Sequence, residues 1–114
     1  MGAVKVKEIN LEYNMPTVQE AMKKLVNSIL TAKGAGYKSV ILIHAYGSSG
    51  VGGSIKTATK LKLKESSLSG IVRGVCAGEC WMENKKKFLD VCPQLKDFSR
   101  HIDGNLGITV VLLK

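Results

Sequence analysis

The sequence predicts an α/β protein with one mixed four-stranded sheet, and three observations support this fold class. Strand-like and helix-like segments alternate in the order β-α-β-α-β-(α)-β, which favours right-handed crossovers between parallel strands. The predicted strand over 39–44 shows no alternation, because residues 40–43 are all apolar, as in a strand whose two faces are both covered. The chain has 114 residues, 45% of them apolar, which suits a single domain over residues 1–114 with one core.

The amino-terminal part is predicted to form the first strand and the first helix. Residues 3–11 alternate between apolar and charged side chains, with one slip of phase midway. Thr17 and Glu20 form a capping box that begins a helix, which Gly34 and Gly36 then end. Its apolar residues recur at helical spacing and form one stripe expected to face the core: Val18, Ala21, Met22, Leu25, Val26, Ile29 and Leu30.

After the strand over 39–44, a glycine-rich loop leads to a second helix, predicted from an N-cap at Ser54 to about Lys64. Three further elements are expected: a short strand over 70–75, a helix over 82–89 that ends before Pro93, and a last strand over 109–113. The helices that start at Thr17 and Ser54 are expected on one face of the sheet, because each has a single apolar stripe.

The composition predicts a polyanionic partner. Lys and Arg number 17 against 9 acidic residues, giving a formal charge of +8. Such an excess favours nucleic acid or another phosphate-bearing ligand. No apolar run has the length of a membrane span, and the first residues lack the apolar region of a signal peptide. We therefore expect a cytoplasmic protein with no membrane partner.

The cysteines offer a weak metal signal. Cys76, Cys80 and Cys92, together with His101, could form a zinc site, but their spacing is loose. Buried or half-buried thiols are the favoured interpretation, because three cysteines without an export signal do not make a disulfide framework. Neither a metal nor a cofactor is expected.

The candidate site is the junction that follows the strand over 39–44. A buried strand, a glycine-rich loop and a helix start come in succession, and such a junction directs backbone N–H groups and the positive end of a helix dipole at a phosphate. The spacing of a Walker A motif is present and Ser54 fits its last position, but Gly53 stands where that motif needs Lys. Nucleotide hydrolysis is therefore not expected. The phosphate-binding candidates in this junction are His44, Tyr46, Gly47, Ser48, Ser49, Gly50, Gly52, Gly53 and Ser54.

His44 has two interpretations of equal weight. It closes a strand at the carboxyl edge of the sheet, where ligands bind in open α/β folds, so it could be a general acid or base or a phosphate donor. It could equally just end the strand. Asn10 and Glu12 end the first strand and lie beside His44 if the two strands are parallel neighbours. Glu12 is then either a base partner or a solvated carboxylate.

Side chains around the junction suggest how a nucleic acid could bind. Tyr46 could stack on a base, and Trp81 is a second aromatic candidate. Lys56 and Lys60 are four residues apart on the second helix and could contact phosphates. The alternative for these lysines is a solvated surface that serves solubility.

Three stretches resemble motifs of the Smr (small MutS-related) domain family. Ile9-Asn10-Leu11-Glu12-Tyr13 resembles the family's L-D-L-[HR]-G pattern, His44-Ala45-Tyr46-Gly47 its H-G-x-G pattern, and the ending over 107–112 its G-x-T-V-V pattern. The resemblance implies a two-layer α/β sandwich similar to the C-terminal domain of translation initiation factor 3. It also implies DNA or RNA binding, often with endonuclease activity.

The chain departs from the family at the positions linked to cleavage. Asn10 replaces the family aspartate, Glu12 the histidine or arginine, and Ala45 the first glycine of H-G-x-G. His44, Glu12 and Asn10 are thus the candidate catalytic residues of an activity expected to be weak or lost. The expected function is nucleic-acid binding, with RNA ahead of DNA. The alternative functions are binding or turnover of a small phosphorylated ligand at the glycine-rich loop, or a protein-interaction domain.

Overall fold

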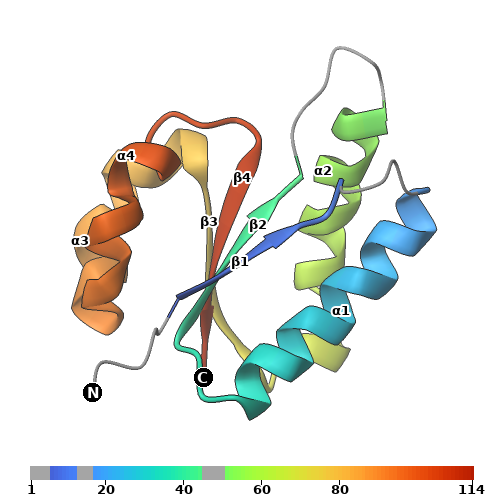
Figure 1. Cartoon of the computed structure of the whole chain (residues 1–114), viewed down its shortest axis with the longest axis horizontal. Helices are drawn as coiled ribbons and strands as arrows, with labels where there is room; N and C mark the ends of the chain where they lie inside the picture. Colours follow the sequence, from blue (N-terminus) through green and yellow to red (C-terminus); the bar gives the residue numbers. More distant parts are fainter. Residues whose placement is uncertain (1–5, 13–16, 45–50) are drawn as a thin grey trace.

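The structure is a computed structural model that describes residues 6–12, 17–44 and 51–114. It confirms the predicted fold class, because four strands form one mixed sheet in the order β1-β2-β4-β3 (Figure 1). β1 is parallel to β2, whereas β4 lies between β2 and β3 and is antiparallel to both. The strands are β1 (Val6–Asn10), β2 (Ser39–Ile43), β3 (Val72–Ala77) and β4 (Ile108–Leu113).

Helices cover both faces of this sheet (Figure 1). α1 (Val18–Gly34) and α2 (Val51–Leu63) pack together on one face, as predicted, and share a core cluster with the strands. This part of the fold is the expected sandwich of a sheet and a helical layer. On the other face lie α3 (Trp81–Val91), a 3-10 segment (Pro93–Phe98) and α4 (Ser99–Ile102), which pack on a second core cluster.

The two covered faces explain the slip of phase in the first strand. Val6 is buried in the cluster under α3 and α4, whereas Ile9 and Leu11 are buried in the cluster under α1 and α2. A strand with apolar cover on both faces has no need of a strict period of two. β2 shows the same property more fully, since Val40, Ile41 and Leu42 are all completely buried.

α1 starts and ends as the sequence predicts. The Thr17 hydroxyl accepts the N–H of Glu20, and the Glu20 carboxylate accepts the N–H of Thr17, so the capping box is present. Gly36 follows the helix with φ of 88°, a conformation that favours glycine. The prediction that Leu30 belongs to the buried apolar stripe is wrong, because this side chain is 46% exposed.

α2 begins earlier than predicted. Its first residue is Val51, so Gly52, Gly53 and Ser54 lie inside the helix rather than in the loop or at the N-cap. Glycine disfavours a helix by only about 1 kcal/mol, a preference that tertiary context can override. The expected third strand is shifted by two residues, to Val72–Ala77, and the helix before Pro93 covers Trp81–Val91.

Candidate functional site

The carboxyl ends of three strands meet at one edge of the sheet. β1 and β2 are parallel, and β3 shares their direction because both β2 and β3 are antiparallel to β4. Asn10, His44 and the residues after Ala77 therefore lie along this edge, where β4 begins with Ile108 and Thr109. Ligands of open α/β sheets bind at such an edge, which makes it the candidate site of this fold.

His44 lies at the predicted edge, but its side chain is enclosed. The residue is completely buried, and its Nε2 atom is 2.7 Å from the Thr109 Oγ1 atom. Its backbone N–H donates to the carbonyl of Gly107 at 2.9 Å, which anchors the end of β2 to the turn before β4. Nε2 thus faces a protein hydroxyl, which favours the structural interpretation of His44.

Asn10 and Glu12 are neighbours of this strand end, as expected for parallel strands. Asn10 pairs in register with Ile43, the residue before His44. The Asn10 Oδ1 atom accepts the backbone N–H of Glu12 at 2.9 Å, so this side chain stabilises the turn after β1. The Lys24 Nζ atom donates to the Asn10 carbonyl at 2.8 Å. Asn10 therefore has structural partners on both its side chain and its backbone.

Lys56, one of the two predicted phosphate contacts on α2, has an acidic partner in the structure. Its Nζ atom lies 2.7 Å from Glu79 Oε1, and the two side chains are 15% and 36% exposed. The hydrogen bond from Lys56 is the main cause that lowers the pKa of Glu79, and the charges of Lys60 and His44 act in the same direction. Lys56 and Glu79 thus form an ion pair near the sheet edge.

Sequence reasoning missed Glu79. The end of β3 is the signal that could have identified Glu79. β3 runs in the same direction as β2, so a carboxylate directly after β3 lies at the same edge of the sheet as His44. The predicted strand ended at residue 75, whereas β3 ends at Ala77, and the short 3-10 turn Gly78–Cys80 follows at once. Because the prediction ended this strand two residues too early, it did not place Glu79 at the edge where His44 lies.

A close backbone contact holds this turn in position. The Gly104 N–H donates to the Gly78 carbonyl at 3.0 Å. A Cβ atom added to Gly78 would come within 2.3 Å of the Asn105 carbonyl oxygen. The Asn105 Oδ1 atom accepts the N–H of Gly107, whose carbonyl binds His44. Glu79 and His44 are therefore fixed through the same turn.

The other predicted contacts of the nucleic acid differ in exposure, and several lie outside the described residues. Lys60 and Ser54 are exposed on α2, on the helix that begins near the end of β2. Outside the described residues lie Tyr46, Gly47, Ser48, Ser49 and Gly50. Trp81, the second aromatic candidate near the loop, is completely buried and donates to the Ser99 hydroxyl at 3.0 Å, so its ring is enclosed by the protein.

The four zinc candidates do not gather. Cys76 and Cys92 are buried, Cys80 is exposed, and the His101 Nε2 atom lies 3.7 Å from Glu8 Oε2. Burial raises the pKa of the Cys76 thiol to about 11, with a smaller contribution from Cys80, which keeps Cys76 protonated at neutral pH. Within the described part of the chain, no three His, Cys, Asp or Glu side chains group in a way that could hold a metal ion.

Comparisons with protein-family models, with characterised proteins and with solved structures find no match to this chain. Among the helices in the described ranges, none is long and apolar enough to cross a membrane. The fold and the edge site are thus the basis for any functional proposal.

Proposed function

We propose that this chain is a divergent Smr-like domain that binds nucleic acid, RNA ahead of DNA, through the face formed by α1 and α2. The observation behind this proposal is the uneven distribution of charge. Residues 17–65, which contain both helices, include eight Lys and two Glu, whereas residues 78–107 include five basic and five acidic residues. Most of the net charge therefore belongs to one helical layer.

The lysines of this layer are suited to phosphate contacts that do not depend on base sequence. Lys60 and Lys64 are exposed near the carboxyl end of α2, and Lys23 of α1 lines the same groove as Lys62 of α2. Lys side chains that neutralise several phosphates release counterions, which gives affinity with a strong dependence on salt. Such contacts position a strand without reading its bases.

The experiment is a salt titration of binding to labelled single-stranded RNA and to duplex DNA, measured by fluorescence anisotropy. Replacing both Lys60 and Lys64 with Ala should weaken binding and reduce the slope of log K against log salt by about 0.7 for each lost contact to a single strand. The matched control replaces Lys86 and Lys87 on α3, both exposed, with Ala. Equal weakening by both double variants would contradict the proposal.

The alternative, a small phosphorylated ligand, predicts a different result in the same titration. One bound phosphate gives a shallow salt dependence, and a mononucleotide should then bind as tightly as a strand. The lysines of this region extend over 56–64, which favours a longer ligand. The ion pair between Lys56 and Glu79 also supplies an internal counter-charge at the edge where a single phosphate would bind.

A further inference from the structure

We propose a second binding site, independent of the nucleic-acid face: the groove between β1 and α1 takes an extended peptide that adds to β1 as a strand and places an acidic side chain in the cavity beside it. The inference depends on the outer edge of β1, which pairs with no other strand among the described residues, on the cavity next to that edge, and on the chemistry of the residues that line this cavity.

β1 is the end strand of the sheet, and its outer edge has backbone groups that β2 does not use. The Leu11 N–H donates to the Ile43 carbonyl, so alternate residues of β1 bond to β2 and the intervening residues, including Glu8, direct their N–H and C=O outward. Asn10 is one of these outward residues, and its carbonyl binds Lys24 at 2.8 Å. The outward groups of Glu8 are therefore suitable for pairing with an added strand.

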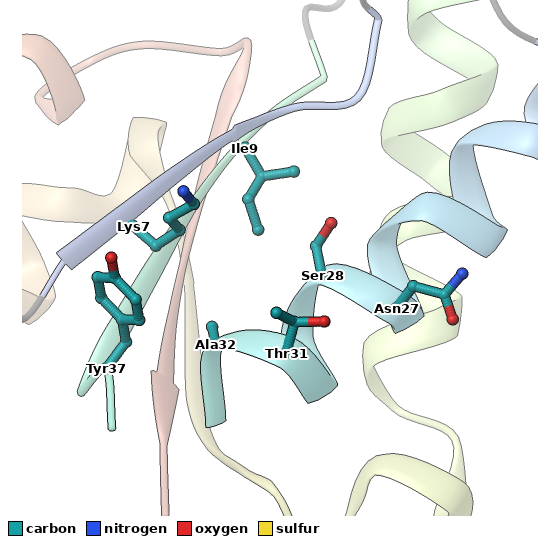
Figure 2. A pocket seen from close by; sticks show the side chains of 7 residues that line it. All are labelled: Lys7, Ile9, Asn27, Ser28, Thr31, Ala32 and Tyr37. Atoms are coloured by element: carbon teal, nitrogen blue, oxygen red, sulfur yellow. The ribbon is translucent and has the colours of Figure 1, made fainter. Parts of the chain in front are cut away.

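A cavity of about 240 Å³ lies beside this edge (Figure 2). Lys7 and Ile9 project from β1 toward it, and side chains of α1 project from the other side. Ile9 and Ala32 are buried and give the cavity an apolar floor. The full set of lining residues is Lys7, Ile9, Asn27, Ser28, Thr31, Ala32 and Tyr37.

The lining residues favour an acidic group. The polar groups are the Lys7 ammonium and the hydroxyls of Ser28, Thr31 and Tyr37, whereas the Asn27 amide is directed away from β1 in Figure 2, and none of the described residues that line the cavity is acidic. Ammonium and hydroxyl groups can both donate to a carboxylate. A carboxylate in the cavity would therefore meet several donors and the positive charge of Lys7.

The size and position of the cavity favour one side chain of a strand over a separate small molecule. Ligand pockets usually measure about 300–1,000 Å³, so this cavity is small for a whole ligand. A helix beside a free strand edge is the arrangement in which proteins add a peptide strand: main-chain bonds give affinity, and pockets for alternate side chains give specificity.

The test uses a blocked, fluorescein-labelled peptide of nine residues that alternates threonine and valine and has glutamate at its centre. Binding should be saturable by fluorescence anisotropy and should fall about tenfold when lysine replaces the central glutamate. Lys7→Glu should cause a similar loss, whereas Lys86→Glu at an exposed position of α3, on the other face of the sheet, should not. Hydrogen exchange of the Glu8 amide should slow when the glutamate peptide is bound.

Several results would overturn the proposal. One is equal binding of the glutamate and lysine peptides; another is an unchanged exchange rate at Glu8. Binding of N-acetylglutamate amide as tight as that of the peptide would indicate a small-anion site instead. Self-association of the peptide-free protein that Lys7→Glu abolishes would assign this edge to a second copy of the chain. Lys7 is exposed, so folding of the variant is readily checked by circular dichroism.

Discussion

Two buried threonines differ in how their hydroxyls are satisfied. The Thr109 Oγ1 atom lies 2.7 Å from His44 Nε2, and the residue is 1% exposed. Thr59 is completely buried on α2, and its Oγ1 atom has no hydrogen-bond partner among the described residues. A buried hydroxyl without a hydrogen-bond partner destabilises the folded state. When a hydrogen-bonded hydroxyl is removed, the group that was bonded to it is left without a partner.

The same isosteric change should therefore have opposite effects at these two positions. We expect Thr109→Val to lower the free energy of unfolding by about 1–3 kcal/mol, because it leaves the His44 ring without this partner. We expect Thr59→Val to raise it by about 1 kcal/mol. Urea denaturation of both variants measures the difference, and a change of the same sign in both would contradict this account.

Gly78 is a second position where one residue controls the local structure. An added Cβ would lie 2.3 Å from the Asn105 carbonyl oxygen and 2.7 Å from that of Ile102, and both atoms belong to the backbone. Gly78→Ala should lower the free energy of unfolding by about 1–3 kcal/mol through overpacking. Gly34→Ala is the matched control, because a Cβ atom added there would meet nothing within 4 Å. Equal effects in urea denaturation would show that the contact at Gly78 relaxes without cost.

At the scale of elements, the ion pair of Lys56 with Glu79 joins the two helical layers. Lys56 belongs to α2, and Glu79 to the 3-10 turn that leads into α3 on the other face of the sheet. Any phosphate that binds Lys56 must compete with this carboxylate. A positive charge of one helical layer is therefore neutralised by a negative charge of the other, near the edge of the sheet where His44 lies.

Glu79→Gln should tighten nucleic-acid binding about twofold to fivefold at low salt, because the amide is a weaker competitor for Lys56. Glu83→Gln on α3 is the control, because it removes one carboxylate and leaves the ion pair between Lys56 and Glu79 intact. The hydrogen bond from Lys56 lowers the pKa of Glu79, so protonation of this carboxylate should tighten binding of the parent protein only at pH values below the ordinary range of a glutamate. Weaker binding by Glu79→Gln in anisotropy titrations would show that the pair supports the bound state.

At the scale of the whole molecule, two of the three candidate catalytic residues, Asn10 and His44, have structural contacts in the described part of the chain. Asn10 has no carboxylate and stabilises a turn, and the His44 ring is enclosed against Thr109. Loss of a required general base typically reduces a rate by a factor of about 10² to 10⁴. We therefore expect that the chain binds nucleic acid but cleaves it weakly or not at all.

Purified protein should bind labelled RNA and supercoiled DNA without cutting either over hours of incubation. Gel analysis of the nucleic acid after incubation checks this, with Glu12→Gln as the comparison. If the parent protein cuts and Glu12→Gln does not, then Glu12 acts as the base in spite of the departures from the family pattern.

The elements that the sequence predicted well are those whose signals are local. The Thr17 capping box, the stop at Gly36 and the buried run of β2 each depend on residues close together in the chain. The helix start at Val51 was missed, because glycines argue locally against a helix that the fold nevertheless forms. Leu30 was predicted to face the core, but the buried face of α1 is narrower than its apolar residues indicate, and Leu30 lies outside that face.

The sequence by itself determined the α/β class, the order of the elements and the strand end at which His44 lies. Only the tertiary structure decided what His44 and Lys56 contact, because Thr109 and Glu79 are 65 and 23 residues away along the chain. Periodicity and capping report on neighbours within a few residues. The partners of a buried imidazole or a half-buried ammonium are set by sheet order and register, which no local pattern contains.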